Sequence, residues 1–570
     1  MYSASSALLE ALHEAGVAYI FANFGSDHPA LIEAIAEAKA TGRAIPSVIT
    51  CPNEMVALSC AHGYAQLTGH AQAVIVHVDC GTQALGGAVH NVARGRAPVL
   101  IFAGMSPSTQ EGELRGSRNE FIHWLQDVPD QRAIVRQYMK YTHEIRSGRN
   151  VEQIVCRALQ LARSDPKGPV YLVGAREVME EATETVQIDM SEWQPVAPAP
   201  LPAEGVTQLA EALAKARRPL VVTSYVGRSH GAVEALIRFC RLAGAGVIES
   251  APSCMNFPHD NPFYLGNQWN EPFQNPMLAD ADLVIVIDSD VPWIPTVNRP
   301  NDRAAIFHID IDPLKEAATL WYIGARRSFR ADAALALGQL NDALAARPIE
   351  PGALDERSRH WADAHARRLS QLANLEVGGN GEITPEYLTA RVRLQIGPDA
   401  IVLSEGITNY PAICNHSART RPGTYFASGG SSLGWSGGAA IGMKLAQPDR
   451  TIVSLTGDGS YMFSIPSTVH WMARQYRTPF LQVVYNNRGW KAPRFSALAV
   501  HPQGYASRAN DLGLRFDPPP DYAGIAAAAG GAHACLIKRA DEIDGAIAEG
   551  LRVVREEKRC AVIDAWLAES

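Results

Sequence analysis

Two turns that end apolar runs in the C-terminal third carry oxygen ligands suited to a divalent cation. The run TIVSLT ends in a Gly-Asp-Gly turn that contains Asp458, and FLQVVY is followed by Asn486 and Asn487. In an open parallel sheet, ligands bind at the carboxyl ends of the strands. Carboxylate and amide oxygens suit Mg²⁺, which completes its shell with water and phosphate oxygens. Gly457 and Gly459 would let the backbone approach a phosphate closely.

Either turn alone is also common where a strand simply ends, so the pairing of the two carries the prediction.

The strands and helices that must position these two turns are visible as apolar runs alternating with amphipathic segments. The clearest runs lie at 71–78, 98–104, 219–225, 282–288, 451–457 and 480–486. Such runs are typical of strands in parallel sheets that helices cover on both faces.

Two breaks in composition divide the chain into three α/β units. The first is the Pro-rich stretch at 194–205, and the second is a charged stretch from about 345 to 381 that ends in GGNGE. We therefore expect units at 1–190, 200–345 and 380–570, each with a parallel sheet flanked by helices.

Composition narrows the class of protein. The chain has 570 residues, of which 47% are hydrophobic and 19% charged, with 51 basic and 59 acidic side chains. No basic excess exists to neutralise a nucleic acid, and no apolar run is long enough for a membrane span. The nine cysteines form no C-x-x-C pair, and the N-terminus does not resemble a secretory signal. We expect a cytoplasmic enzyme that binds neither nucleic acid nor membrane.

The two turns, about thirty residues apart, resemble the diphosphate-and-metal signature of thiamine diphosphate (ThDP) enzymes. The stretch ASGGSSLGWSGGAAIGMKLAQPDRTIVSLTGDG (427–459) is similar to the pyrophosphate-binding (PP) domain of the acetolactate synthase and 2-oxo acid decarboxylase group. ITCPNEMVALSCAHGYAQLTG (49–69) resembles that group's pyrimidine-binding (PYR) domain, and DLVIVIDSD with HIDIDP resembles its Rossmann-like middle domain. The resemblance covers nearly the whole chain and implies PYR, middle and PP domains in the three units above.

The resemblance also implies which residues hold the cofactor. Asp458, Asn487 and the Gly489 carbonyl would bind Mg²⁺. The spacing from Asp458 is slightly longer than in the family, which leaves Asn486 as an alternative ligand. Leu433 would lie between the two rings of the cofactor and hold it bent. Further cofactor contacts are expected at Gly429, Ser431, Gly457, Gly459 and Ser460.

Glu54 is the candidate for activating the cofactor. It follows the strand-like SVITC and opens the helical pattern EMVALSCAHGYAQL. By resemblance, its carboxyl group would hydrogen-bond N1′ of the aminopyrimidine and take part in removing the C2 proton. The alternative is a glutamate that only complements a helix dipole.

Four residues are candidates for handling the substrate. His77 precedes an Asp-Cys-Gly turn, and Ser26 lies in NFGSDHPAL. Benzoylformate decarboxylase-like members have a histidine and a serine at matching positions, which implies proton relay by His77 and carboxylate binding by Ser26. His28 is a rival for the relay, and a histidine that only fills the core is the alternative for His77. Gln126 resembles an active-site glutamine of synthases and lyases, or is a surface-helix residue.

Three residues after the metal loop are candidates for the substrate entrance. By resemblance, Trp490, Lys491 and Arg494 would line it, and the two cations could pair with a carboxylate or phosphate. The alternative is a solvated helix face. In the middle unit, the Ser224–Arg228 turn lacks the glycines of a diphosphate-binding loop, so we do not expect FAD, while an ADP or CoA ligand stays open.

The predicted activity is ThDP- and Mg²⁺-dependent cleavage or formation of a C–C bond in a 2-oxo acid, as in decarboxylases and acetolactate synthase-like carboligases. The alternative is a 2-hydroxyacyl-CoA lyase that releases formyl-CoA. A third hypothesis is a non-catalytic regulatory or nucleotide-binding protein on the same scaffold. The presence of Glu54, Asp458 and Asn487 together argues against it. The resemblance further implies a homodimer or homotetramer with active sites between subunits.

Overall fold

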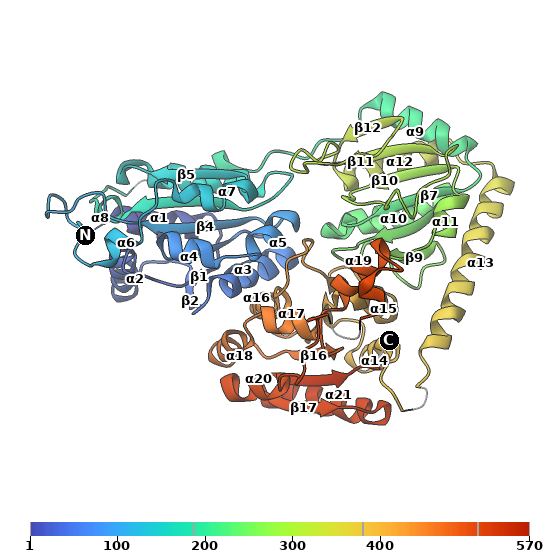
Figure 1. The fold of residues 1–570 in the computed structure, drawn as a ribbon. Helices are drawn as coiled ribbons and strands as arrows, with labels where there is room; N and C mark the ends of the chain where they lie inside the picture. The colour runs from blue at the N-terminus through green and yellow to red at the C-terminus, as the bar shows by residue number, and fades with distance from the viewer. Residues whose placement is uncertain (1, 186–187, 379–380, 510–511, 569–570) are drawn as a thin grey trace.

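Three parallel six-stranded sheets, each built from one continuous segment, organise the chain (Figure 1). The computed structural model describes residues 2–185, 188–378, 381–509 and 512–568. Helices cover the sheets on both faces, which confirms the predicted α/β class. The six apolar runs singled out in the sequence are all strands, namely β3, β4, β7, β10, β15 and β16.

The first and third sheets have the same strand order, counted from the first strand of each. The first sheet runs β2 (Ser47–Thr50), β1 (Tyr19–Ala22), β3 (Gln72–Val76), β4 (Val99–Met105), β6 (Val170–Ala175) and β5 (Tyr141–Ile145). The third runs β14 (Tyr425–Phe426), β13 (Ile401–Glu405), β15 (Ile452–Gly457), β16 (Leu481–Asn486), β18 (Ala561–Trp566) and β17 (His533–Ile537). In both sheets the order reverses beside the first strand, and such switch points open a crevice for ligands at the carboxyl ends.

The second sheet has a different, Rossmann-like order. It runs β12 (Arg327–Arg330), β11 (Ala305–Asp310), β10 (Leu283–Ile287), β7 (Pro219–Thr223), β8 (Gly246–Ser250) and β9 (Tyr264–Gln268). Its switch point lies between β10 and β7.

Helices connect successive strands within each unit. The N-terminal unit contains α1 (Ala4–Glu14), α2 (Pro29–Thr41), α3 (Glu54–Thr68), α4 (Val78–Ala84), α5 (Ala88–Arg94), α6 (Ile122–Leu125), α7 (Val151–Arg163) and α8 (Arg176–Glu180). The middle unit contains α9 (Ala203–Lys215), α10 (His230–Ala243), α11 (Pro276–Asp280) and α12 (Ala333–Ala346). The C-terminal unit contains α14 (Pro385–Ile396), α15 (Tyr410–Ser417), α16 (Ser436–Ala446), α17 (Asp458–Phe463), α18 (Pro466–Gln475), α19 (Lys491–Val500), α20 (Tyr522–Gly530) and α21 (Ile543–Arg552). The charged break between the second and third units is the long helix α13 (Pro351–Leu375), on the right of Figure 1.

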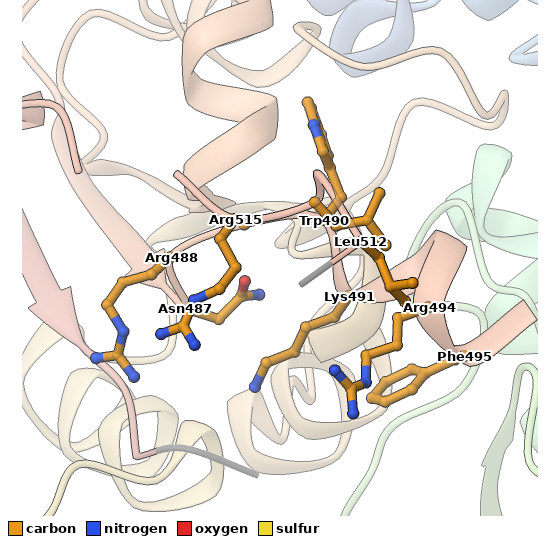
Figure 2. A pocket seen from close by; sticks show the side chains of 10 residues that line it. Asn487, Arg488, Trp490, Lys491, Arg494, Phe495, Leu512 and Arg515 are labelled. Atoms are coloured by element: carbon orange, nitrogen blue, oxygen red, sulfur yellow. The ribbon is translucent and has the colours of Figure 1, made fainter. Parts of the chain in front are cut away.

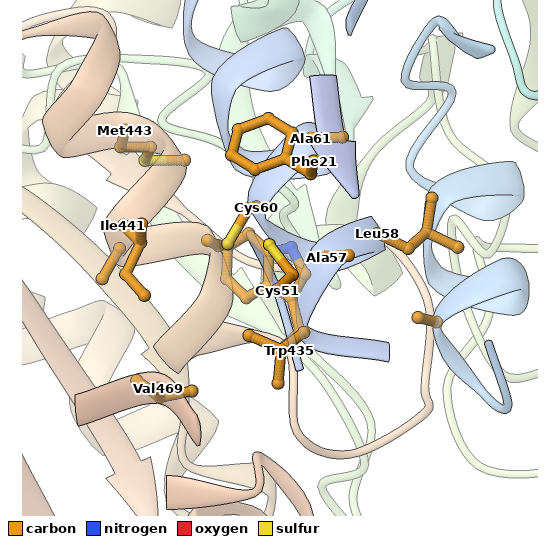
Figure 3. Close-up of a cluster of buried hydrophobic side chains, with 14 of the residues drawn as sticks. Phe21, Cys51, Ala57, Leu58, Cys60, Ala61, Trp435, Ile441, Met443 and Val469 are labelled. Carbon is orange, nitrogen blue, oxygen red and sulfur yellow. The ribbon is translucent and has the colours of Figure 1, made fainter. Parts of the chain in front are cut away.

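The N-terminal and C-terminal units pack together through α3 and α16. Glycines make the close approach: a Cβ on Gly442 would lie 2.0 Å from the Cys60 carbonyl oxygen, and one on Gly63 would lie 2.5 Å from that of Ala439. Buried side chains of both units form one apolar cluster around this contact, including Phe21, Cys60 and Trp435 (Figure 3). The two units are therefore held in a fixed relation by a shared core.

Among the residues that the structure describes, none of the helices combines the length and the apolar character that a membrane crossing requires.

Candidate active site

The first half of the candidate site lies where the strand order of the N-terminal sheet reverses. Asn23 follows β1 and His77 follows β3, on the two sides of the switch point, and Glu54 opens α3 after β2. Because parallel strands end at one edge, these loops lie together. Glu54 is buried, and its Oε1 accepts a hydrogen bond of 2.8 Å from Asn23 Nδ2.

Glu54 and His77 lie on either side of one glycine. A Cβ on Gly81 would be 3.1 Å from Glu54 Oε1 and 3.1 Å from the Cβ of His77. Gly25 is more tightly constrained, because a Cβ there would lie 1.9 Å from His77 Nδ1. A side chain at Gly25 would displace the histidine, so this glycine keeps His77 in place.

His77 is held at both ring nitrogens. Its Nδ1 hydrogen-bonds Asp27 Oδ1 and its Nε2 lies 2.8 Å from Gln126 Oε1. Burial lowers the pKa of His77, but the hydrogen bond and charge of Asp27 outweigh burial and raise it. A carboxylate and an amide oxygen at the two nitrogens favour the imidazolium form, with both nitrogens donating.

Asp27 is buried and fixed by the backbone. Its Oδ2 accepts a hydrogen bond of 3.0 Å from the Val78 amide, and a Cβ on Gly104 would collide with it. Burial raises the pKa of Asp27, but His28, His77 and the Val78 amide together bring it below its usual value. The sequence analysis did not single out Asp27; its position five residues after β1, in the loop that faces β3, was the available signal.

His28 and Ser26 differ in what surrounds them. The His28 side chain is fully buried, and its Nδ1 accepts a 3.0 Å hydrogen bond from the Gly25 amide. Burial lowers the pKa of His28 and so favours its neutral form, whereas the pKa of His77 is raised. Ser26 Oγ is buried without a partner among the described residues. The structure thus brings His77 and Gln126 together, with Ser26 next to Asp27 in the loop that holds His77, and buries His28 in the core.

The second half lies at the matching switch point of the C-terminal sheet. Asp458 follows β15 and is buried; its Oδ1 accepts a 2.8 Å hydrogen bond from the Gly459 amide and its Oδ2 a 3.0 Å bond from the Gly489 amide. Burial raises the pKa of Asp458 to about 6, against the opposing effect of these amides. A buried carboxylate of raised pKa, next to an asparagine, is suited to compensation by a cation.

The two asparagines after β16 have different surroundings. Asn486 donates to Asp564 Oδ1 at 2.9 Å, and its Oδ1 accepts from the Arg488 amide at 3.1 Å. By contrast, Asn487 Oδ1 is buried and has no partner among the described residues. Ser460 Oγ is buried without a described partner as well. The donor set of Asp458, Asn487 and the Gly489 carbonyl fits a hard divalent cation, and Asn486 is already committed to the fold.

Gly459 differs from the expectation that it opens space for a phosphate. A Cβ there would lie 2.2 Å from the Trp490 ring, so this glycine makes room for Trp490. That ring packs edge-on against Phe463 and Phe516, with centroids 5.9 and 5.0 Å away. At Gly457 a Cβ would meet only ordinary contacts.

The loop between β14 and α16 carries the remaining cofactor candidates. Buried Glu405, at the end of β13, accepts hydrogen bonds of 2.6, 2.9 and 2.8 Å from the amides of 434, 435 and 436 and so fixes this loop. Leu433 is partly buried there. Ser431 is exposed and contacts His90 of α5 at 3.1 Å, and Gly429 packs against Gly95. Glu405 was missed in the sequence, although it ends a strand next to β15.

A pocket of about 210 Å³ opens beside the metal-binding loop (Figure 2). Asn487, Gly489, Trp490, Lys491 and Arg494 line it, with Arg488, Phe495, Leu512, Leu514 and Arg515. Every lining residue belongs to the C-terminal unit, so Glu54 and His77 do not contribute to it.

Comparison with known proteins places this geometry in a family. Three models of thiamine pyrophosphate enzymes match: the N-terminal TPP binding domain at residues 2–134, the central domain at 206–340 and the C-terminal TPP binding domain at 406–565. Benzoylformate decarboxylase of Pseudomonas aeruginosa is 26% identical over 87% of this chain and 88% of its own length. Acetolactate synthase 2, chloroplastic, of Zea mays is 25% identical over 85% of this chain and 73% of its own.

A solved structure shares the fold over the full length. The thiamine diphosphate-dependent 4-hydroxybenzoylformate decarboxylase of Rhodococcus jostii RHA1 aligns with a TM-score of 0.78 at 20% identity, covering 100% of this chain and 99% of that one. The three matching domains follow one another in the order of the three sheets. The chain therefore belongs to the thiamine diphosphate enzymes, in the superfamily of benzoylformate decarboxylase and acetolactate synthase, and is an enzyme of the lyase and carboligase kind.

Proposed function

We propose that this enzyme binds ThDP together with Mg²⁺ and cleaves or forms the C–C bond next to the carbonyl of a 2-oxo acid. The observation that carries the proposal is the position of His77, which is held between Asp27 and Gln126 beside Glu54 and whose pKa Asp27 raises. This arrangement provides a proton donor at the place where a 2-oxo acid would react.

The residues divide the work between two ends of the cofactor. Asp458, Asn487 and the Gly489 carbonyl would hold Mg²⁺ and through it the diphosphate, and Leu433 would support the bent cofactor. Glu54 would hold the aminopyrimidine and exchange a proton with it. When bound, ThDP supplies a nucleophilic carbon that attacks carbonyl groups.

Substrate handling falls to the loops after β1 and β3. The imidazolium of His77 donates a proton to the substrate oxygen, and Asp27 stabilises its charge and keeps its orientation. The free hydroxyl of Ser26 binds the substrate carboxylate. Gln126 holds the second ring nitrogen of His77 until the substrate replaces it.

We also propose that each active site forms between two subunits. Exposed apolar side chains border both halves: Phe121 and Leu125, 76% and 74% exposed, adjoin Gln126, and Phe463, 49% exposed, packs on Trp490. Figure 1 shows α6, which Phe121 precedes and Leu125 ends, well apart from α17, which contains Phe463, in one chain. Apolar surface of this kind marks interfaces, and a two-fold pairing would bring one half from each subunit together twice.

The crevice of the middle sheet supports a structural role for that unit. At its switch point, the Ser224 and Tyr225 amides donate to the Asp288 carbonyl at 3.0 and 3.1 Å. Arg96 of the N-terminal unit stacks on Tyr225 and pairs with Asp290 at 2.9 Å. Because these amides are the groups that would bind a diphosphate, we propose that neither FAD nor an ADP-like ligand binds there.

A product screen tests the proposed activity. Purified protein with ThDP and Mg²⁺ is incubated separately with pyruvate, benzoylformate and a 2-hydroxyacyl-CoA. We expect CO₂ release from at least one 2-oxo acid, and loss of it without ThDP. Formyl-CoA release from the thioester alone would support the 2-hydroxyacyl-CoA lyase alternative, and absence of ThDP binding in calorimetry would refute both.

A further inference from the structure

Three side chains of types that commonly bind metal ions are buried together between the middle and C-terminal units. Glu249 lies in β8, His259 in the loop between β8 and β9, and Cys414 in α15. They are 0%, 4% and 1% exposed. One ligand atom from each of the three lies within 4.8 Å of the other two. This cluster is distinct from the residues assigned above to ThDP, Mg²⁺ and the substrate.

Two of the three ligand groups are held in place by neighbouring residues. Glu249 Oε1 accepts hydrogen bonds of 2.8 and 3.0 Å from the backbone amide and Nδ2 of Asn256. Glu249 Oε2 accepts one of 2.8 Å from the Tyr264 hydroxyl. The Tyr264 ring also stacks on His259, with centroids 4.3 Å apart. Partners of this kind orient the ligands of metal sites in proteins.

The spacing of the imidazole and the carboxylate is compatible with a tetrahedral ion. His259 Nε2 and Glu249 Oε2 are 3.2 Å apart. Two ligand atoms at the usual bond length of about 2.0 Å from a tetrahedral Zn²⁺ lie about 3.3 Å from each other. A direct hydrogen bond has the same length, but a buried pair of this kind does not require a thiol. The convergence of Cys414, from a different unit, on this pair is what indicates a metal site.

The charges of the three groups suit a divalent cation. Burial raises the pKa of Glu249, but its hydrogen bonds and the charge of His259 bring it below its usual value, which favours the carboxylate. Burial and the charge of Glu249 raise the pKa of the Cys414 thiol. A divalent cation would compensate the carboxylate and a Cys414 thiolate together, with His259 neutral. Sulfur and imidazole ligands favour Zn²⁺, whereas Mg²⁺ prefers oxygen.

From this arrangement we propose that Glu249, His259 and Cys414 bind a Zn²⁺ ion that links the middle unit to the C-terminal unit. With three protein ligands, water would take the fourth tetrahedral position. The role of the ion would be structural, because it would add to an existing contact between the two units, where Asn267 Nδ2 donates to Asn415 Oδ1 at 2.7 Å. Its removal should loosen this contact and leave ThDP binding intact.

Metal analysis of the untagged holoenzyme tests the proposal. Protein with ThDP and excess Mg²⁺ is dialysed against a small excess of Zn²⁺, desalted and measured by inductively coupled plasma mass spectrometry. We expect about one zinc per chain, and loss of it in Cys414→Ala and in Glu249→Gln. Cys240→Ala is the matched control, because it removes another fully buried thiol, in α10 and outside the cluster. It should retain the zinc.

Two further measurements keep the test decisive if a variant folds poorly. Wild-type protein loaded with Co²⁺ in place of Zn²⁺ should show a thiolate-to-cobalt charge-transfer band in the near ultraviolet. A zinc chelator should lower the melting temperature of the wild-type protein, since an ion that binds only the folded state stabilises it. The chelator should leave the melting temperature of Cys414→Ala unchanged.

The opposite results would overturn the inference. If the wild-type protein binds no zinc, the cluster is a buried pair of Glu249 and His259 beside a thiol. If Cys414→Ala retains the zinc, or if Co²⁺ binds without the charge-transfer band, the metal lies elsewhere. Calorimetry with ThDP and Mg²⁺ separates this outcome from the proposed function. Loss of ThDP binding on removal of zinc would refute the structural role, whereas failure of the zinc-loaded wild type to bind ThDP would refute the proposed function.

Discussion

His77 owes its raised proton affinity to Asp27, and this dependence can be measured. In Asp27→Asn the negative charge is lost while burial remains, so the pKa of His77 should fall. The limb of the pH profile of kcat/KM that reports His77 should therefore move to lower pH. NMR titration of the His77 ring in the same variant checks the assignment, and an unmoved limb would show that another group sets it.

The same substitution should change stability in a defined pH range. A pKa raised by folding stabilises the native state below the unfolded pKa of histidine, about 6.5, and the gain is lost as pH rises through the folded pKa. The free energy of unfolding of wild type should thus exceed that of Asp27→Asn mainly at mildly acidic pH. Denaturant titrations at acidic and alkaline pH provide the comparison.

Although Asn486 and Asn487 are adjacent, their substitution should have different effects, on cofactor binding for Asn487 and on stability for Asn486. Asn487→Ala removes an unpaired buried oxygen, so ThDP binding in the presence of Mg²⁺ should weaken by at least about 10-fold, as even outer-shell changes at metal sites do. Asn486→Ala breaks the bond to Asp564 and should instead lower stability by about 1–3 kcal/mol. Calorimetry and thermal melts of both variants decide, and the reverse pattern would assign the metal to Asn486.

At the residue scale, the sequence predicts those site residues that lie near the end of an apolar run. His77 and Asp458 stand directly after a strand and Glu54 four residues after one, so strand ends identify them. Asp27 and Glu405 act through contacts with residues 50 and about 30 positions away, which no local pattern records. The contact of Gly459 with Trp490 could not be predicted for the same reason, since Trp490 follows another strand.

At the scale of elements, the packing of α3 on α16 positions Glu54 and the loop that carries Leu433. Gly442→Ala would place a Cβ 2.0 Å from the Cys60 carbonyl oxygen. We expect it to destabilise the protein by about 1–3 kcal/mol, despite the better helix propensity of alanine. Gly338→Ala in α12 meets nothing within 4 Å and should stabilise by up to about 1 kcal/mol. Denaturant titration measures both, and equal effects would show that α3 and α16 can separate freely.

Strands were easier to predict than their order. Runs such as 452–457 are buried at every position, because helices cover both faces of each sheet. The identical strand order of the first and third sheets leaves no such trace, since it depends on which side of the first strand each crossover takes. That order, rather than the strands themselves, creates the two switch points where Glu405, Asp458, Asp27 and His77 lie.

At the scale of the whole molecule, we propose that two half-sites on similar sheets complete each other across two subunits. Among the described residues, the pocket by Asn487 is lined by the C-terminal unit alone, and the hydrogen bonds of His77 go to Asp27 and Gln126 of the N-terminal unit. Exposed apolar side chains at both places, Phe121 and Phe463 among them, fit a pairing of unlike halves across a two-fold axis.

Subunit mixing tests this assembly directly. Glu54→Gln and Asp458→Ala should each be inactive, but exchange between them creates mixed dimers with one doubly defective site and one intact site. Because random exchange leaves about a quarter of all sites intact, about that fraction of wild-type activity should return. Glu54→Gln mixed with His77→Ala is the matched control, since both changes lie in the same half and every site keeps a defect. No recovery in the first mixture, with exchange shown by mass spectrometry, would mean that each chain completes its own site.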